Sequence, residues 1–129
     1  MNGRTDIPPV YVFDTNVIIK HLNDGTSVLW RGKRFISVVT DMEVLAKPHI
    51  SLEAEQNALL FLRGFTIVPL SDTVKYEAIR NRREGSPRLK LPDAIIAATA
   101  VVFDAQLITA DEKLRRFAWP GFSAILPSA

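Results

Sequence analysis

The chain has 129 residues, of which 47% are hydrophobic and 23% are charged, and this composition excludes a disordered or fibrous chain. Sixteen Lys and Arg residues against fourteen Asp and Glu residues leave a net charge of +2, so charge alone does not imply a nucleic-acid partner. The lack of Cys excludes a disulfide scaffold, a thiol nucleophile and Cys-based metal sites, and it favours the reducing cytoplasm.

We expect residues 1–9 to be a loose lead-in and residues 10–129 to form a single domain. The lead-in carries Asp6 and two prolines where a signal peptide would need an apolar segment. The longest nearly apolar run, residues 94–103, has about half of the roughly 20 residues that span a bilayer. It therefore predicts a buried helix and no membrane partner.

Short apolar runs alternate with segments of helical spacing along the first half of the chain. The predicted elements of this half, in chain order, are a strand at residues 10–13, a helix that follows Asp14 and Thr15 and stops before Gly25, a strand at residues 35–39, a helix that opens at Thr40 and ends at Pro48, a helix at residues 52–63 capped by Ser51, and a strand at residues 65–69.

The second half continues the alternation. Its predicted elements are a helix that begins at Ser71 or Asp72, a polar and basic stretch at residues 81–90, a helix at residues 93–103 preceded by Pro92, a strand at residues 106–109, a short helix at residues 112–117 and a last apolar run at residues 123–126. Short apolar strands alternating with helices predict a three-layer α/β fold, with a mainly parallel sheet of four to five strands covered by helices on both faces.

Several common chemistries are missing from the sequence. The six glycines are isolated, so there is neither a dinucleotide-binding motif nor a P-loop. His21 and His49 have no metal-ligand spacing, and no Ser lies in a nucleophile-elbow motif. We therefore expect the two histidines at helix surfaces or helix ends, and we expect neither zinc hydrolysis nor a Ser-His-Asp triad.

Four acids remain as candidates for a site. Asp14 directly follows the first predicted strand, Glu43 lies in the helix after the second, and Asp111 comes two residues after the strand that ends at Thr109. Because the carboxyl ends of parallel strands share one edge, these acids can converge there, and Asp93 joins them if its helix begins at the same edge. Helix capping is the alternative explanation for each acid, and residues 40–43 and 109–112 both fit a capping box.

The magnitudes favour a bound cation if the acids do converge. A cap contributes only about 1 kcal/mol, whereas two carboxylates 4 Å apart repel by about 4 kcal/mol at an effective dielectric constant near 20. Clustered acids are therefore costly unless a cation lies among them. Oxygen ligands without His or Cys favour Mg²⁺ or Mn²⁺ over zinc.

Four segments in this order, VFDTNVII, ISVVTDMEVL, LPDAIIAATA and LITADEKLRRF, resemble those of the PIN-domain ribonucleases, especially the VapC toxins of toxin–antitoxin pairs. The resemblance extends from Val10 to about Leu126 and implies a Mg²⁺-dependent (or Mn²⁺-dependent) endoribonuclease. It implies an acidic metal site made of Asp14, Glu43, Asp93 and Asp111, supported by Asn16 and Thr109. Asp41 and Glu112 are further acids beside the matched positions.

The resemblance also implies partners: an RNA substrate, a second copy in a homodimer, and a small antitoxin whose segment covers the acidic groove, commonly with an Arg that reaches the carboxylates. Residues 59–61 are candidates for an apolar contact. An acidic site repels phosphate, so cations must hold the RNA backbone. The candidates beside the acids are Arg80, Arg82, Arg83, Arg88, Lys90, Lys113, Arg115 and Arg116, with Trp30, Lys33 and Arg34 as a weaker group.

Two other functions stay open on the sequence alone. The first is a phosphatase with Asp14 as covalent nucleophile, although Asn16 stands where that chemistry wants a second acid. The second is a metal-binding or RNA-binding module without turnover. Cations at the end of a helix also interact with the helix dipole, which is the structural alternative to RNA binding for Arg115 and Arg116.

Overall fold

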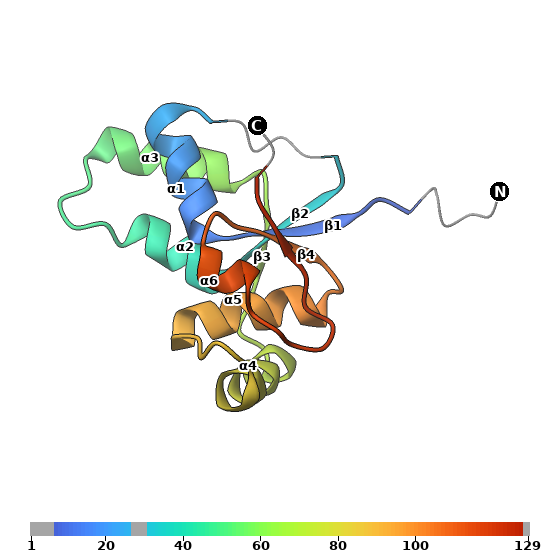
Figure 1. Cartoon of the computed structure of the whole chain (residues 1–129). Coiled ribbons are helices and arrows are strands. Elements are labelled where there is room, and N and C mark those ends of the chain that lie inside the picture. The colour runs from blue at the N-terminus through green and yellow to red at the C-terminus, as the bar shows by residue number, and fades with distance from the viewer. Residues whose placement is uncertain (1–6, 27–30, 128–129) are drawn as a thin grey trace.

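The computed structural model describes residues 7–26 and 31–127, and these ranges contain five strands and six helices (Figure 1). In chain order the elements are β1 (Val10–Phe13), α1 (Thr15–Asp24), β2 (Lys33–Ser37), α2 (Val38–Leu45), α3 (Leu52–Leu62), β3 (Thr66–Val68), α4 (Asp72–Glu84), α5 (Leu91–Val102), β4 (Gln106–Ile108), α6 (Glu112–Arg115) and β5 (Ala124–Ile125). The predicted α/β class is confirmed.

The five strands form one parallel sheet in the order β3-β2-β1-β4-β5. The first strand is central: Val12 of β1 pairs with Phe35 of β2 on one side, and Phe13 pairs with Ile108 of β4 on the other. The chain builds the sheet outward from β1 to β3 and then returns to the opposite side of β1. The strand order therefore reverses between β1 and β4, which is where ligands bind in sheets of this kind.

Neighbouring residues of the central strands point to opposite faces of the sheet and so belong to two separate cores. Val12 and Leu107 are fully buried in the core that α4 and α5 cover. The next residues along each strand, Phe13 and Ile108, are fully buried in the core that α1, α2 and α3 cover. Figure 1 shows these two groups of helices on opposite sides of the sheet. The middle positions of the central strands are apolar on both sides, because both faces of the sheet are covered.

The second strand ends earlier than predicted. The Ser37 hydroxyl accepts a hydrogen bond from the backbone N–H of Val39 at 3.0 Å and caps α2, so the helix begins at Val38. The prediction of a strand through residue 39 and of a helix that opens at Thr40 is therefore wrong. Branched side chains favour a strand here, but the Ser cap sets the boundary. Thr40 is buried within α2 and caps nothing, so the capping box predicted at residues 40–43 is wrong too.

Helices α4 and α5 are both longer than predicted. The first continues to Glu84, so the beginning of the stretch at residues 81–90 is helical, and the second begins at Leu91, before Asp93. Asn81 shows why the sequence misleads at this point. Its side chain is fully buried, and its Nδ2 donates to the carbonyl oxygen of Ala94 at 3.1 Å, which joins the two helices. A polar residue used in this way looks like a surface residue in the sequence.

The predicted buried helix at residues 94–103 corresponds to most of α5, where Ala94, Ile96 and Ala100 are fully or almost fully buried. Among the helices that the structure describes, none is both long enough and apolar enough to cross a bilayer. The predicted short helix ends sooner, at Arg115, and Phe117 is buried in the core beyond it. Residues 7–9 form no helix or strand, and the rest of the predicted lead-in, together with Trp30, lies outside the described residues.

Candidate active site

The carboxyl ends of β1 and β4 bring Asp14 and Thr109 together at the point where the strand order reverses. The backbone N–H of Asp14 donates to the carbonyl oxygen of Ile108 at 2.9 Å. The Thr109 hydroxyl donates to Oδ2 of Asp14 at 2.7 Å. The exposed fractions of Asp14 and Thr109 are 3% and 0%, so this contact is the buried floor of the site.

The Asp14 carboxylate is fixed by two further donors. Its Oδ2 also accepts from Nδ2 of Asn16 at 3.0 Å, and its Oδ1 accepts from the backbone N–H of Thr15 at 2.8 Å. Asn16 is itself held, because its Oδ1 accepts from the backbone N–H of Ala110 at 3.2 Å. Asp14 is also the N-cap of α1, so the capping explanation and the site explanation apply to the same residue. Three neutral donors orient the carboxylate before any ligand binds.

Asp111 is connected to Asp14 through Thr109. The backbone N–H of Asp111 donates to the Thr109 hydroxyl at 3.0 Å. The Oδ1 of Asp111 accepts from the backbone N–H groups of Lys113 and Leu114 at 2.8 and 3.4 Å and caps α6. The capping box predicted at residues 109–112 is therefore wrong in its N-cap, because Asp111 and not Thr109 caps the helix. The Thr109 hydroxyl binds Asp14 instead.

Glu43 reaches the site from the first turns of α2. Its side chain is exposed, and its Oε1 accepts a hydrogen bond from the Thr15 hydroxyl at 2.6 Å. The Thr15 and Thr40 hydroxyl oxygens are 3.0 Å apart, so the two hydroxyls are hydrogen-bonded to each other. Thr15 and Thr40 are absent from the predicted site, because their contact depends on the packing of α1 against α2. The only signal in the sequence is the place of Thr15 between Asp14 and Asn16.

Burial and mutual repulsion disfavour the charged forms of two of the acids. Burial raises the pKa of Asp14 to about 6, and the charges of Asp93 and Asp111 contribute, against hydrogen bonds from Thr109 and Thr15 that lower it. Burial, followed by the charges of Asp111 and Glu43, also raises the pKa of Asp93, which lies half-buried in the first turn of α5. Asp93 therefore lies within electrostatic reach of each of the other three predicted acids.

The residues fit a hard divalent ion that keeps part of its water. In residues 7–26 and 31–127 none of the four acids forms an ion pair, although the charges of Lys90 and Lys113 act on Asp93 from farther away. No three carboxylate or imidazole groups in the described residues are close enough to enclose an ion by themselves. Mg²⁺ is commonly held by one or two carboxylates plus waters, which suits an open site with an all-oxygen donor set.

The further acid Glu112 and the two histidines have other surroundings. Glu112 pairs with Arg116 at 3.7 Å on the surface of α6. The Nδ1 of His21 is 2.6 Å from the carbonyl oxygen of Thr26 at the end of α1, and its ring stacks on Phe61 at 4.1 Å. His49 is exposed in the turn after α2. His21 is thus near a helix end, as the sequence predicts, whereas His49 lies in the turn between α2 and α3 and is not part of a helix.

The predicted cations differ in what surrounds them. Lys90, the N-cap residue of α5, and the half-buried Lys113 both lower the pKa of Asp93, so their charges act on the site. Arg82 and Arg83 line a hollow of about 310 Å³ beside α5. Arg80 instead pairs with Glu77 at 3.4 Å and lies over the Trp119 ring, 5.6 Å from its centroid.

Of the remaining candidates, Arg88 and Arg115 are exposed. In the weaker group, Lys33 is exposed on β2, whereas Arg34 lies over the Phe65 ring, 5.6 Å from its centroid. The Arg34 guanidinium thus has a partner on the face of the sheet that α1–α3 cover.

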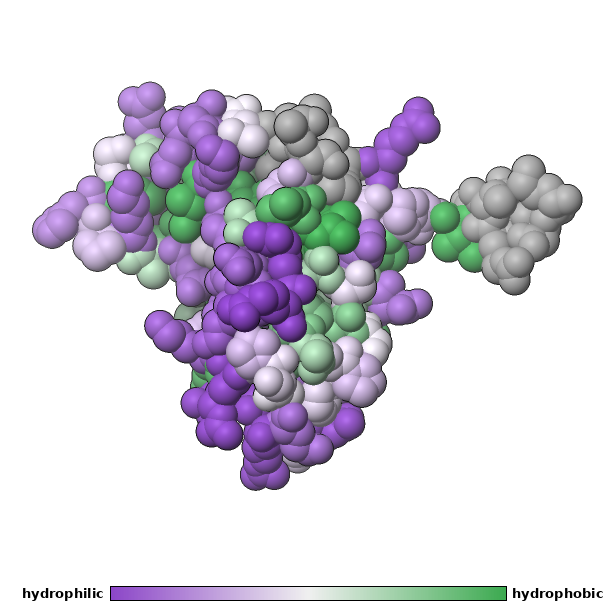
Figure 2. All heavy atoms as spheres, viewed as in Figure 1, coloured by the Kyte–Doolittle hydropathy of each residue, from purple (hydrophilic) through white to green (hydrophobic). Residues whose placement is uncertain are grey.

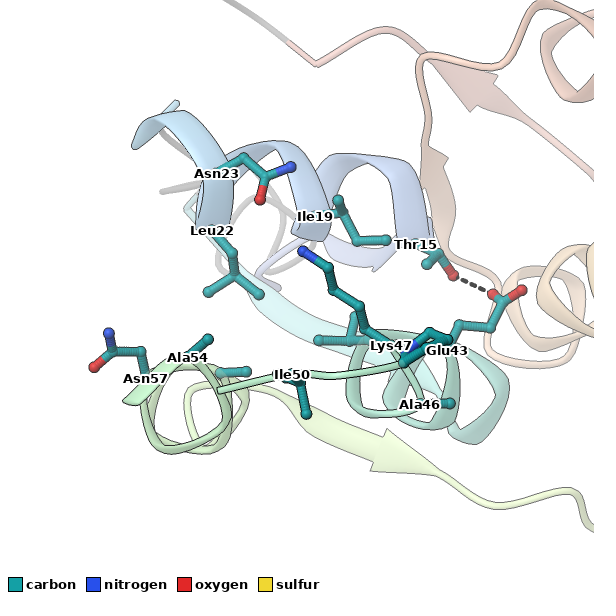
Figure 3. A pocket seen from close by; sticks show the side chains of 13 residues that line it. Thr15, Ile19, Leu22, Asn23, Glu43, Ala46, Lys47, Ile50, Ala54 and Asn57 are labelled. Atoms are coloured by element: carbon teal, nitrogen blue, oxygen red, sulfur yellow. Dashed lines mark hydrogen bonds between the residues drawn. The ribbon is translucent and has the colours of Figure 1, made fainter. Parts of the chain in front are cut away.

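A cleft of about 740 Å³ lies between α1, α2 and α3, and Thr15 and Glu43 line one end of it (Figure 3). Its walls are largely apolar and include Ile19, Leu22 and Ile50. Figure 2 shows apolar side chains over these helices, bordered by hydrophilic ones. Leu59 and Leu60 of the predicted apolar contact are exposed on α3, whereas Phe61 is half-buried against the core.

The sequence matches the family model for the PIN domain over residues 11–120, so the chain belongs to the PIN-domain family, a family of nucleases. A chain of a solved toxin–antitoxin complex from Klebsiella pneumoniae is 31% identical, with a TM-score of 0.74 over 92% of this chain and 98% of that chain. No curated protein matches the sequence significantly.

Two VapBC structures share the fold. A chain of VapBC2 from Rickettsia felis, bound to promoter DNA, is 18% identical with a TM-score of 0.73 over 91% of this chain and 98% of that one. A chain of VapBC-5 from Mycobacterium tuberculosis is 22% identical with a TM-score of 0.68 over 92% and 99%. The resemblance to the PIN-domain family is confirmed, and the chain shares its fold with chains of VapBC complexes.

Proposed function

We propose that this chain is a Mg²⁺-dependent or Mn²⁺-dependent endoribonuclease that hydrolyses RNA phosphodiester bonds at the acidic site between β1 and β4. The observation that carries the proposal is Asp14, a buried carboxylate that neutral donors hold in place and that has no cationic partner in the described part of the chain. The charges of Asp93 and Asp111 act on Asp14, and that of Glu43 acts on Asp93, so a divalent cation would offset the repulsion among these acids.

Each residue of the site has a role in this proposal. A bound divalent ion makes water a stronger nucleophile near neutral pH and stabilises the charge on the leaving oxygen. Asp14 and Asp93 are the principal ligands, and Glu43 and Asp111 hold a second ion or act through water. Thr109 and Asn16 orient Asp14 through the hydrogen bonds that they donate to its Oδ2. Asn16 therefore donates a hydrogen bond to Asp14, whereas the phosphatase alternative wants a second acid at this position.

Cleavage of defined RNA oligomers with and without a chelator tests this function. We expect internal cleavage that stops on chelation and returns with Mg²⁺ or Mn²⁺. Cleavage that continues after complete removal of divalent ions would contradict the mechanism. Release of phosphate from a small ester without RNA cleavage would favour the phosphatase, and ion binding with neither product would favour a non-catalytic module.

The cations beside Asp93 are proposed to hold the RNA backbone. We expect Lys90→Gln to raise KM several-fold with little change in kcat, and to reduce the slope of log(kcat/KM) against log salt by about 0.7, the value for one phosphate contact on a single strand. The matched control is Arg63→Gln, at the end of α3 that leads into the opposite end of the sheet. Equal KM and salt slopes in both variants would remove Lys90 from the RNA-binding surface.

The biological role that we propose is that of a toxin, inhibited by a small antitoxin, in the cytoplasm where its RNA substrate lies. The structural neighbours in toxin–antitoxin complexes support this role. An antitoxin Arg that pairs with these acids would offset part of their charge and block the place of an ion. We also propose a homodimer, which light scattering of the purified chain tests directly.

A further inference from the structure

We propose that Thr15 is a positioning residue, whose hydroxyl holds Glu43 in the place where a divalent ion needs it. This inference rests on the proposed function and adds a residue to that site. Thr15 is the first residue of α1 and lies half-buried between Asp14 and the cleft.

A single residue joins two of the acids. The backbone N–H of Thr15 donates to Oδ1 of Asp14 at 2.8 Å, and its hydroxyl donates to Oε1 of Glu43 at 2.6 Å (Figure 3). Glu43 is exposed on α2, and a free Glu side chain would lose rotamer freedom on binding an ion. The Thr15 hydroxyl removes that freedom in advance and ties the position of Glu43 to that of Asp14.

The Glu43 carboxylate sets the direction of both hydroxyl contacts. An ionised carboxylate only accepts hydrogen bonds, and a hydroxyl has one hydrogen, so Thr15 donates to Glu43 and must accept from Thr40. The two hydroxyl oxygens are 3.0 Å apart, and Thr40 is fully buried. Donation from Thr40 polarises the Thr15 hydroxyl and strengthens its bond to the carboxylate. The hydrogen bond uses Oε1 of Glu43 and leaves Oε2 for an ion or its water.

Titration of the metal-free protein with Mn²⁺ tests this role, beside RNA cleavage by the same samples. We expect Thr15→Val, which keeps the shape and removes the hydroxyl, to weaken Mn²⁺ binding and kcat/KM by about 10-fold to 100-fold. Thr15→Ser should restore both to within about threefold of the wild-type values. Thr73→Val, on the exposed surface of α4, is the control for loss of a Thr hydroxyl. If Thr15→Val does not fold, Thr15→Ala serves in the same comparison.

A cycle with Glu43→Gln separates positioning from general stability. If Thr15 acts through Glu43, Thr15→Val should weaken Mn²⁺ binding no further in the Glu43→Gln background. Equal binding in wild type and Thr15→Val, or full additivity in the cycle, would overturn the inference even if the wild type cleaves RNA. Glu43-dependent and Thr15-dependent Mn²⁺ binding without RNA cleavage would support the inference and reject the nuclease function. Absence of Glu43-dependent Mn²⁺ binding would overturn the inference but not the nuclease function, which RNA cleavage by the wild type tests separately.

Discussion

Asp14→Asn should lower kcat/KM for RNA by on the order of 100-fold or more, because loss of an outer-shell partner alone costs 10-fold to 100-fold and Asp14 is a proposed direct ligand. The substitution keeps the shape of the side chain and removes its charge. The expected loss is therefore one of ion binding, which a titration with Mn²⁺ measures independently of cleavage.

The metal-free Asp14→Asn variant should stay folded, because two effects on its stability oppose each other. Burial raises the pKa of Asp14 from 3.8 to about 6, so the charged carboxylate costs about 3 kcal/mol of folding free energy at pH 7, and the amide removes that cost. The new amide N–H₂ must face a donor, either the Thr15 N–H or Nδ2 of Asn16, at a cost of about 1–3 kcal/mol. The net change in unfolding free energy at pH 7 should be within about 1–2 kcal/mol.

The matched control is Asp104→Asn, which removes the same charge at an exposed position beyond the end of α5. It should leave cleavage and Mn²⁺ binding unchanged. If Asp14→Asn keeps metal-dependent cleavage near the wild-type rate, the proposed ligand set is wrong. If it unfolds, urea denaturation will show it before any activity is compared.

The fold could be predicted because its signals are local. Runs such as residues 10–13 and 107–108 are apolar on both faces, which a parallel sheet covered on both sides requires. The boundaries that failed depended on single side chains with two competing uses. Ser37 caps a helix whose first residues are valines, and Asn81 is polar yet buried between two helices. Neither use can be read from propensity or periodicity.

The acids of the candidate site were predictable for a topological reason, since strand ends in a parallel sheet meet at one edge. Their hydrogen-bonding partners were only partly predictable. Thr109 and Asn16 lie close in sequence to acids, but the Thr15–Thr40–Glu43 contacts form only when α1 packs on α2. The same limit applies to the cations: Lys113 is half-buried near Asp93 while Arg115, two residues on, is exposed. Side-chain direction on a short helix decides between them.

Without divalent ions, the wild-type protein should lose stability as pH rises from about 4 to about 6. The folded state holds the Asp14 proton up to a pKa of about 6, whereas the unfolded chain releases it near 3.8, so the folded state binds more protons within this window. The decrease in unfolding free energy should approach about 3 kcal/mol, with a further contribution of the same sign from the raised pKa of Asp93. Urea denaturation in a chelator measures it, and Asp14→Asn should flatten much of the curve.

Ion binding should reverse this dependence, because an ion must displace the proton from Asp14 before the carboxylate can serve as a ligand. Mn²⁺ affinity and kcat/KM should each rise about tenfold per pH unit below pH 6 and level off above it, as expected when one proton leaves per ion bound. The stabilisation by a fixed Mg²⁺ concentration should grow over the same range, opposing the loss seen in the chelator. An affinity that stays constant from pH 5 to pH 7 would mean that the ion does not displace a proton from Asp14. The metal site would then have to be built from the more exposed acids alone.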